Sequence, residues 1–505
     1  MRLQLLMGAY EARSVIANAQ RCVNLYVEVN PLLPKASSTN PEGDAPVPDT
    51  HYPMPGLTRL AYATTRQNFR GAFTAKNGAL YVVVYNQVYY VDLNWSFTLL
   101  GTIGTTVGPV SMDNNLTHVL LVDGSENNGY AIELATNEFI FVGAGDLLLE
   151  DGTELLLEDS IALELEPAFY GADVVRVLDG YFLLNRPGTN QFYWSGIESL
   201  SFDALDIATK NGYPDNIVGL TVVHREIWLI GEQTTEIWFN SGAADSTFER
   251  MPGVFIQHGA VSAACIASMD LLSYWVAKDP QGQGFVVRGN NYAVERISTY
   301  ALEKALQGYS TIADAQTYCF QQLGHFFVVI NFPTAGKTWV YDEGAKRWTE
   351  WESMQADGAP GRHRAACVVP AYGAMVAGDF ENGKLYQLSP DVYTEDGLPI
   401  VRRRGFLHLL NDGRRVTYNS FIADVAVGTV ESATPQSIYL RWSDTRGASW
   451  GNPVEQTMGA AGQYLTSVQW QRLGIARDRV FELFWSGPML TAVNGAFITY
   501  SQNES

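Results

Sequence analysis

The chain has 505 residues, of which 47% are hydrophobic, 12% aromatic and only 17% charged, and its formal net charge is −20. Because phosphate binding rests on Lys and Arg, this charge excludes a protein that coats nucleic acid. It is compatible with plain solubility, or with the wall of a channel along which DNA slides without sticking. Many aromatic residues, 46 glycines and few charges favour short strands joined by tight turns.

The cysteines and the N-terminus indicate where the chain first folds. Four cysteines without CxxC spacing are too few for a disulfide framework, so we expect them reduced in the core: Cys22, Cys265, Cys319 and Cys367. The N-terminal apolar run is too short for a signal peptide, and no stretch approaches the roughly 18 apolar residues of a membrane span. We therefore expect synthesis in a cytoplasm and no membrane insertion by this chain.

Residues 1–60 are predicted to form an irregular N-terminal arm, because their composition differs from that of the chain that follows. Within them, 21–28 (RCVNLYVE) has the composition of one strand. A proline-rich loop comes next and is expected to be extended and exposed. It ends in a tight turn at 52–57 (YPMPGL), immediately before the pattern changes.

From about residue 69 onward, hairpins recur at spacings of roughly 40 to 55 residues, which are propeller blade lengths. Each hairpin pairs two short runs of aromatic and β-branched residues across a turn. The units are 78–93, 117–134, 180–194, 226–240, 272–288, 325–352 and 374–388. This repeat predicts an all-β fold with a β-propeller of six or seven blades over 61–395. The best helical candidate is 299–309, where leucines at helical spacing precede a glycine.

The clearest unit is 325–352. A strand of alternating aromatic and β-branched residues is reversed at 333–336, returns, and turns again at 342–344. The outer strand that follows carries Trp348 and Trp351, which we place at the rim of the blade.

An acidic, leucine-rich segment at 146–166 interrupts the repeat. Its unit LLLEDGT is nearly duplicated as ELLLEDS, and Asp151-Gly152 is a hairpin turn signal, although helix also remains open. Inserted between blades, such a hairpin exposes apolar surface unless something covers it. It is either a contact to another subunit or partner, or a hairpin lying on its own propeller. The candidate contact residues are Glu150, Asp151, Glu154, Glu158 and Asp159.

After residue 395 the pattern changes to alternating strands at 421–427, 438–442, 468–473, 479–485 and 496–500. Their spacing predicts a small C-terminal β-sandwich over 396–505. The stretch 443–450 (SDTRGASW) resembles an Asp-box hairpin with Thr445 in the position usually held by aspartate. That motif braces a turn and carries no chemistry.

A basic cluster stands out near the start of this sandwich in an otherwise acidic chain. It is formed by Arg402, Arg403, Arg404, Arg414 and Arg415. Its arginines either meet phosphate or an acidic neighbouring subunit, or flank a turn on two solvated strands.

The sequence carries no recognisable catalytic or metal motif. It lacks a P-loop, GxGxxG after a strand, HExxH, GxSxG and the loop pattern of a calcium site. Its seven histidines are scattered and are expected to be structural. We predict that the chain is not an enzyme and holds no cofactor or metal.

Several stretches, taken in order, resemble one known family. They are RCVNLYVE at 21–28, MPGL at 54–57, HREIWLIGEQTTEIWFNSGAADSTFE at 224–249, MPGVFIQHGAVSAACIAS at 251–268, RGNNYAVERISTYALEKAL at 288–306, and the long stretch 440–487 from LRWSDTRGASW to VFELFWSG. Together they are similar to the packaged-DNA stabilisation proteins of short-tailed bacteriophages, which form the tail hub or nozzle. The acidic segment 146–166 departs from that pattern, so its role does not carry over.

The resemblance implies a structural protein of the virion tail. Such proteins form a homo-oligomeric ring, generally a hexamer, beneath the portal and its adaptor ring. They extend the DNA channel, retain the packaged genome until ejection, and dock tail fibres, spikes or a needle plug. Contact with double-stranded DNA is then transient and non-specific.

Two other functions remain open from the residues alone. A carbohydrate-binding or glycan-cleaving propeller of a receptor-binding tail component would need aromatic platforms beside paired carboxylates. A periplasmic or secreted scaffold propeller is disfavoured by the missing signal peptide.

Overall fold

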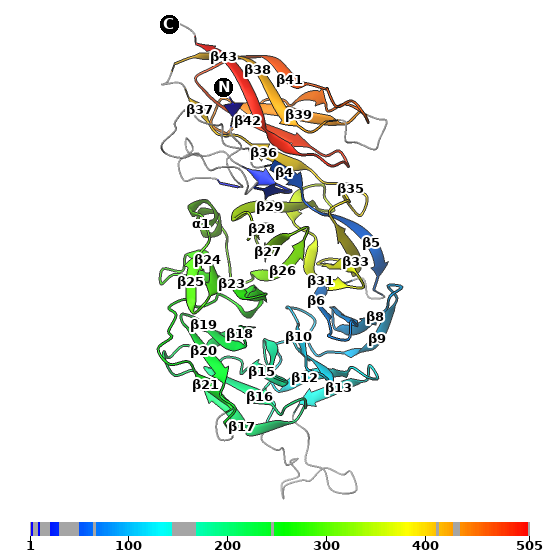
Figure 1. The fold of residues 1–505 in the computed structure, drawn as a ribbon, viewed down its shortest axis with the longest axis vertical. Coiled ribbons are helices and arrows are strands. Elements are labelled where there is room, and N and C mark those ends of the chain that lie inside the picture. The colour runs from blue at the N-terminus through cyan, green and yellow to red at the C-terminus, as the bar shows by residue number, and fades with distance from the viewer. Residues whose placement is uncertain are drawn as a thin grey trace, which may run out of the picture.

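The computed structural model describes residues 2–3, 9–10, 21–29, 50–63, 67–143, 168–243, 247–410, 414–427 and 435–502. In these ranges the fold is all-β, with one α-helix, α1 (Tyr300–Gln307), within the segment 299–309 where the sequence predicted a helix. Thr299 caps its N-terminus. A β-propeller forms the larger part, and a β-sandwich stands on it (Figure 1). The acidic segment 146–166 and its five candidate carboxylates lie outside the described residues.

Within the described chain the propeller has seven blades of four antiparallel strands each. The first three blades are β6 (Phe69–Thr74), β7 (Leu80–Val84), β8 (Gln87–Val91) and β9 (Phe97–Thr102); β10 (Ser111–Asn114), β11 (His118–Val122), β12 (Asn128–Glu133) and β13 (Phe139–Gly143); and β14 (Val175–Leu178), β15 (Tyr181–Asn185), β16 (Gln191–Ser195) and β17 (Phe202–Thr209). The next two are β18 (Ile217–Val223), β19 (Glu226–Gly231), β20 (Thr235–Asn240) and β21 (Phe248–Arg250); and β22 (Ala267–Met269), β23 (Leu272–Lys278), β24 (Gly284–Asn290) and β25 (Ala293–Arg296). The last two are β26 (Gln316–Gln322), β27 (His325–Phe332), β28 (Lys337–Asp342) and β29 (Arg347–Met354); and β31 (Ala365–Ala371), β32 (Ala374–Asp379), β33 (Lys384–Ser389) and β5 (Gly56–Tyr62).

Each hairpin that the sequence predicted is present, and the prediction of six or seven blades is confirmed at seven. The blades stack because side chains alternate between the two faces of each strand, and both faces are apolar. Tyr81 and Val83 of the first blade, for example, share a buried cluster with Val119 and Leu121 of the second. Stacking of this kind leaves few strand edges open to solvent and makes the propeller stiff.

Strand β5 closes the propeller by pairing with β33 along its full length, from Gly56 opposite Ser389 to Tyr62 opposite Lys384. It crosses the boundary that we placed between residues 60 and 61, so the start of the chain and the end of the repeat share one blade. Gly56 allows this approach, because a Cβ atom there would lie 2.4 Å from the carbonyl oxygen of Val392. The seventh blade extends further through β34 (Thr394–Glu395) and β35 (Leu398–Pro399).

The sixth blade does not end at its fourth strand. Strand β29 pairs in parallel with β2 (Cys22–Val23), and the same sheet continues through β36 (Arg402–Gly405), β42 (Asp478–Trp485), β39 (Ser437–Ser443) and β40 (Val454–Thr457). Propeller and sandwich therefore share a sheet. Trp348 and Trp351 lie on β29, the outer strand of the blade as predicted, yet they are only 3% and 0% exposed. The added strands cover the edge that would otherwise face solvent.

The second sheet of the sandwich also takes strands from both ends of the chain. Its order is β3 (Leu25–Glu28), β4 (Thr50–Pro53), β43 (Val493–Gln502), β38 (Val416–Val425) and β41 (Val468–Ala476), with β1 (Arg2–Leu3) paired to β43. The expectation of an irregular N-terminal arm is thus wrong where the arm is described. Its strands are too short to show a clear period in sequence, and they form because β29 and β43 offer open edges.

Asn24 divides the single strand that we predicted at 21–28 into β2 and β3. Its φ of 57° is a left-handed conformation that asparagine tolerates better than most residues. Its side-chain amide donates to the carbonyl oxygens of Glu352 and Val401, both at 2.9 Å, and accepts from the Glu352 amide at 2.7 Å. One buried residue therefore fixes the angle at which the chain leaves the propeller sheet for the second sandwich sheet.

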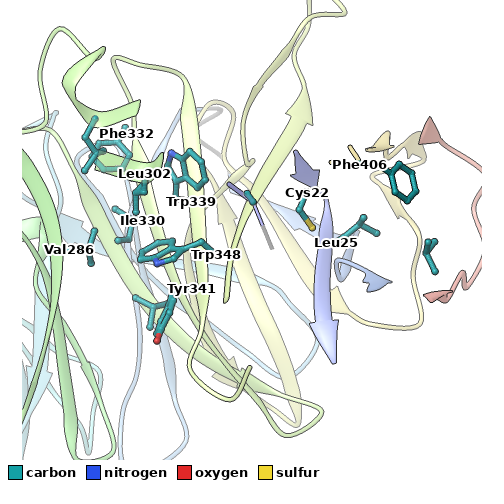
Figure 2. Close-up of a cluster of buried hydrophobic side chains, with 14 of the residues drawn as sticks. Cys22, Leu25, Val286, Leu302, Ile330, Phe332, Trp339, Tyr341, Trp348 and Phe406 are labelled. Atoms are coloured by element: carbon teal, nitrogen blue, oxygen red, sulfur yellow. The ribbon is translucent and has the colours of Figure 1, made fainter. Parts of the chain in front are cut away.

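One hydrophobic core runs across the junction (Figure 2). Trp339 and Trp348 of the sixth blade lie beside Leu302 of α1, while Cys22, Leu25 and Phe406 continue the cluster on the sandwich side. Because these side chains are buried in one contiguous cluster, the two halves are expected to resist rotation about their junction.

We expect Leu25→Ala to destabilise the protein by about 2–5 kcal/mol, because Leu25 is fully buried at the junction and a cavity would remain. Chemical denaturation followed by tryptophan fluorescence measures the change. The control is Leu205→Ala on β17, where the side chain is 87% exposed and a change within about 0.5 kcal/mol is expected. Equal stabilities of the two variants would contradict a junction core that includes the N-terminal segment.

A buried carboxyl group lies where the seventh blade meets the sandwich. Glu395 of β34 accepts a hydrogen bond from Ser353 Oγ at 2.8 Å, and its Oε1 is 3.6 Å from His363 Nε2. Burial raises the pKa of Glu395 to about 7, against the lowering effects of Ser353, Arg364 and Arg402. Burial, together with the nearby Arg364 and Arg362, lowers the pKa of His363 to about 3, so this histidine is neutral at physiological pH.

Glu395 gives the stability a pH dependence of defined sign. Its pKa rises from 4.5 to about 7 on folding, so the folded state binds more protons in that interval. The free energy of unfolding therefore falls as pH rises through the interval. In Glu395→Gln this slope should largely disappear in urea titrations between about pH 5 and 8, whereas Glu249→Gln, at an exposed site, should keep it. An unchanged slope in the Glu395 variant would contradict the assignment.

Candidate functional site

The five arginines of the predicted basic cluster do not lie on one surface. Arg402 and Arg404 of β36 are fully buried, Arg403 between them is half-buried, and Arg414 and Arg415 are exposed. The alternation along β36 directs the first and third arginines into the junction. The idea that 402–404 presents positive charge to a partner is therefore wrong for Arg402 and Arg404.

The two buried arginines hold the junction together. Arg402 donates from its two terminal nitrogens to the carbonyl oxygens of Gly487 and Tyr393, both at 3.0 Å. Burial lowers the pKa of Arg402 to about 10, which leaves it charged at neutral pH. Arg404 lies opposite Cys22 in the pairing of β2 with β36, and burial raises the pKa of the Cys22 thiol to about 11. Their role is structural, because backbone carbonyls rather than solvent surround the charge of Arg402.

The exposed arginines open onto a cleft of about 750 Å³ in the sandwich, which we call the arginine cleft. It is lined by Arg415, Asp444, Thr445, Arg446, Ile475, Ala476, Arg477 and Asp478. Arg414 directly precedes it and is also exposed.

Three segments of the sandwich build this cleft. Arg415 directly precedes β38, whose first residue, Val416, pairs with both Ala476 and Gln502. Arg477 is the single residue between β41 and β42. The third wall is the hairpin after β39, which carries Asp444 to Arg446.

The Asp-box-like hairpin shapes that third wall. Thr445 Oγ1 accepts from the Ser449 amide at 2.8 Å, and Ser443 Oγ accepts from the Gly447 amide at 2.8 Å. Threonine therefore supplies the turn acceptor that aspartate usually provides. Because threonine is neutral, the hairpin adds no negative charge at this position, which keeps the neighbouring cleft more positive.

The carboxylates of the arginine cleft are already engaged. Asp478 accepts from Arg446 Nε at 2.7 Å and lies 2.6 Å from His408 Nδ1. Asp444 is held by the buried Arg479, at 2.6 and 2.8 Å. Within the described residues Arg414, Arg415 and Arg477 have no ion pair, so the cleft carries uncompensated positive charge.

Sequence reasoning found Arg414 and Arg415 but missed Arg446 and Arg477. The arginines at 446 and 477 are visible in the sequence, but their proximity is not. It depends on the pairing of β39 with β42 and of β38 with β41, which joins distant segments.

Nothing in the described chain gathers into a metal centre: no group of three or more His, Cys, Asp or Glu side chains has the required proximity. Cys22 and Cys265 are buried, Cys319 and Cys367 are half-buried, and all four are free thiols, as the sequence indicated. No helix among the described residues is long and apolar enough to cross a membrane.

Two protein-family models match this chain, one over the propeller and one over the sandwich. A family model described as "Bacteriophage P22 Gp10, beta-propeller" matches residues 50–393, and one described as "Bacteriophage P22 Gp10, beta-sandwich" matches residues 404–501. No curated protein sequence matches the chain.

Solved propeller structures resemble it weakly. The WD40 propeller domain of Doa1 has 10% sequence identity to this chain and a TM-score of 0.38. The match covers 66% of this chain and 97% of the Doa1 chain. The N-terminal domain of Nup159 has 9% identity and a TM-score of 0.38, with coverages of 68% and 95%. The Neurospora crassa Pan2 WD40 domain has 10% identity and a TM-score of 0.37, with coverages of 75% and 97%. At these values the likenesses carry no argument about function.

The two family models together cover nearly the whole chain, in the order that the fold requires. The chain therefore belongs to the bacteriophage P22 Gp10 family of packaged DNA stabilisation proteins and is a structural protein of the phage virion tail.

Proposed function

We propose that copies of this chain form a ring, of six subunits, that extends the DNA channel below the portal and its adaptor ring. In this position the ring retains the packaged genome and offers docking surfaces for tail fibres, spikes or a needle plug. Membership of the family, across propeller and sandwich alike, is the observation that carries the proposal. The remaining support comes from stiffness and charge.

Stiffness suits a wall that contains pressurised DNA. The propeller is closed by β5, and the sixth blade continues into the sandwich through β2, so neither half has a simple hinge to the other. Ion pairs reinforce the seam, since Arg21 contacts Glu350 at 3.0 Å and Glu352 at 3.2 Å. Load applied to the sandwich is then transmitted to the propeller through a continuous sheet and core.

The charge distribution suits both a DNA channel and a closed ring. A net charge of −20 gives DNA phosphates little to bind, which favours sliding over sticking. The same charge makes a neighbouring copy an acidic partner for the arginine cleft. A cyclic ring uses two different surfaces of each subunit at every contact, so a positive cleft on one copy and an acidic surface on the next are complementary. We place the arginine cleft at this subunit contact.

Particles assembled without this chain test the retention role. We expect heads that package DNA and then lose it, because the channel below the portal has no further wall or docking site for a plug. The fraction of DNA-filled heads over time, counted by electron microscopy after nuclease treatment, measures the loss. Heads that stay filled as long as complete particles would contradict retention by this ring.

The double variant Arg415→Glu/Arg477→Glu tests the subunit contact. Reversing two unpaired charges should raise the dissociation constant of the ring at least about tenfold, because close charge pairs across interfaces contribute more than 1 kcal/mol. Sedimentation velocity over a concentration series measures this. The matched control is Arg225→Glu, an exposed arginine of the propeller, which should assemble normally.

Two results would overturn the placement of the arginine cleft. Wild-type ring assembly by the double variant would show that the cleft faces no subunit. Normal rings that fail to join particles would place the cleft against the preceding ring of the tail instead. Thermal unfolding of each variant, expected to match the wild type at these exposed sites, separates assembly from folding.

A further inference from the structure

The centre of the propeller contains a cavity of about 320 Å³. It is lined by the innermost strands of several blades and the segments that lead into them, at 68–72, 108–112, 173–174, 176, 263–264, 266, 316–318, 362 and 366–367, together with Phe380. Three arginines line it: Arg70, Arg176 and Arg362. Buried charged side chains need partners, because removing a charge from water is costly.

Two of these arginines are engaged by the fold. Arg70 donates to the carbonyl oxygens of Tyr85, Thr105, Val107 and Gly108, at distances from 2.6 to 2.9 Å, and so fixes the segment that leads into β10. Arg176 donates from one terminal nitrogen to Ser111 Oγ at 3.1 Å and to the carbonyl oxygen of Val175 at 2.7 Å, and the carboxylate of Asp113 offsets its charge. Both charges are therefore met by groups of the protein.

Arg362 differs, because its guanidinium has no hydrogen bond or ion pair within the described residues. It is only 8% exposed, and its guanidinium carbon lies 3.7 Å from the centre of the Phe380 ring. Burial lowers its pKa to about 10, so it remains charged at neutral pH. Stacking on Phe380 fixes the guanidinium plane and leaves its N–H groups directed along the edges of that plane.

The carboxylates around Arg362 do not form an ion pair with it within the described residues. Asp379 accepts from Tyr386 at 2.7 Å and from Arg364 at 3.4 Å, and Glu381 lies 3.7 Å from Arg364. Asp314 accepts from the Thr334 amide at 2.6 Å through one oxygen, while its other oxygen is buried without a partner. These carboxylates attract Arg362 at a distance, and none of them occupies its N–H groups.

A second polar group of the cavity is also without a partner. The hydroxyl oxygen of Thr317 on β26 is buried and makes no hydrogen bond. Thr317 and Arg362 line the same cavity. The one carboxylate among the lining residues, Asp173, is engaged by Asn185 Nδ2 at 2.8 Å. The unused groups are thus a cation and a hydroxyl, which together are suited to an oxygen anion.

We propose that the central cavity binds a small oxyanion, of the phosphate or carboxylate class, through Arg362 and Thr317. A guanidinium held flat by an aromatic ring presents two parallel N–H groups to two oxygens of such an anion. The threonine hydroxyl donates a third hydrogen bond. Bound there, the anion neutralises the buried charge and links β26 to β30 (Pro360–Arg362), which pairs with β29 in the sheet of the sixth blade. The site is independent of ring formation and of the arginine cleft.

Titration calorimetry of the full chain with inorganic phosphate, and separately with acetate and succinate, tests the proposal. At constant ionic strength set by chloride, we expect saturable binding of at least one class with one site per chain, and a saturable rise in Tm in its presence. The class that binds identifies whether phosphate or carboxylate is the natural chemistry.

Variants locate the site. Arg362→Lys keeps the charge but loses the paired donors, and Thr317→Val keeps the shape but loses the hydroxyl. We expect the affinity to fall at least about tenfold in the first and about threefold or more in the second, since each loses a hydrogen bond to a charged ligand. The control Arg225→Gln, whose side chain is 80% exposed, should bind as the wild type does.

The proposal is overturned by either of two results. One is the absence of saturable binding of phosphate, acetate and succinate to the wild-type chain. The other is binding that persists with unchanged affinity in both the Arg362→Lys and the Thr317→Val variants, which would place the anion elsewhere. Both variants retain the size and charge of the native site, and their melting curves without anion show whether they have folded.

Discussion

The pairing of β2 with β29 is the contact on which the rest of the molecule depends. A propeller blade normally ends at its fourth strand, but here the N-terminal segment adds to that strand and carries the sheet onward into the sandwich. Asn24 then turns the chain so that β3 joins the second sandwich sheet. The start of the chain is thereby built into both halves. A repeat domain and an appended domain become one stiff body, which is the mechanical property that a tail component requires.

Several unusual burials follow from this junction. Trp348 and Trp351 are enclosed because the blade edge is covered, and Arg402 is enclosed because β36 lies between the propeller and the body of the sandwich. Each buried polar group must then find its partners inside the protein. Arg402 finds backbone carbonyls, whereas within the described residues Glu395 accepts a hydrogen bond only from Ser353 and holds its proton more tightly. The seam therefore joins the two halves and also contains a group whose protonation changes near neutral pH.

Positive charge in this acidic chain is divided among three uses. Some arginines, such as Arg70, support loops through carbonyl oxygens, and others, such as Arg479, hold a carboxylate at the surface. A third group, including Arg362 in the propeller and Arg477 in the sandwich, has donors to spare. Composition alone cannot separate these uses, since the same side chain serves all three. The distinction depends on what surrounds each guanidinium.

The sequence by itself determined the parts that repeat. The hairpins of the seven blades, helix α1 and the five longer strands of the sandwich could be predicted, because period-2 alternation and turn residues are local signals. What only the tertiary structure decided are the contacts between distant segments. Closure by β5, the covered edge of β29, the burial of Arg402 and Arg404, and the meeting of Arg415 with Arg477 all join residues that lie far apart in the chain. Such pairing depends on which strand edges are left open once the blades have stacked, and no local pattern encodes that.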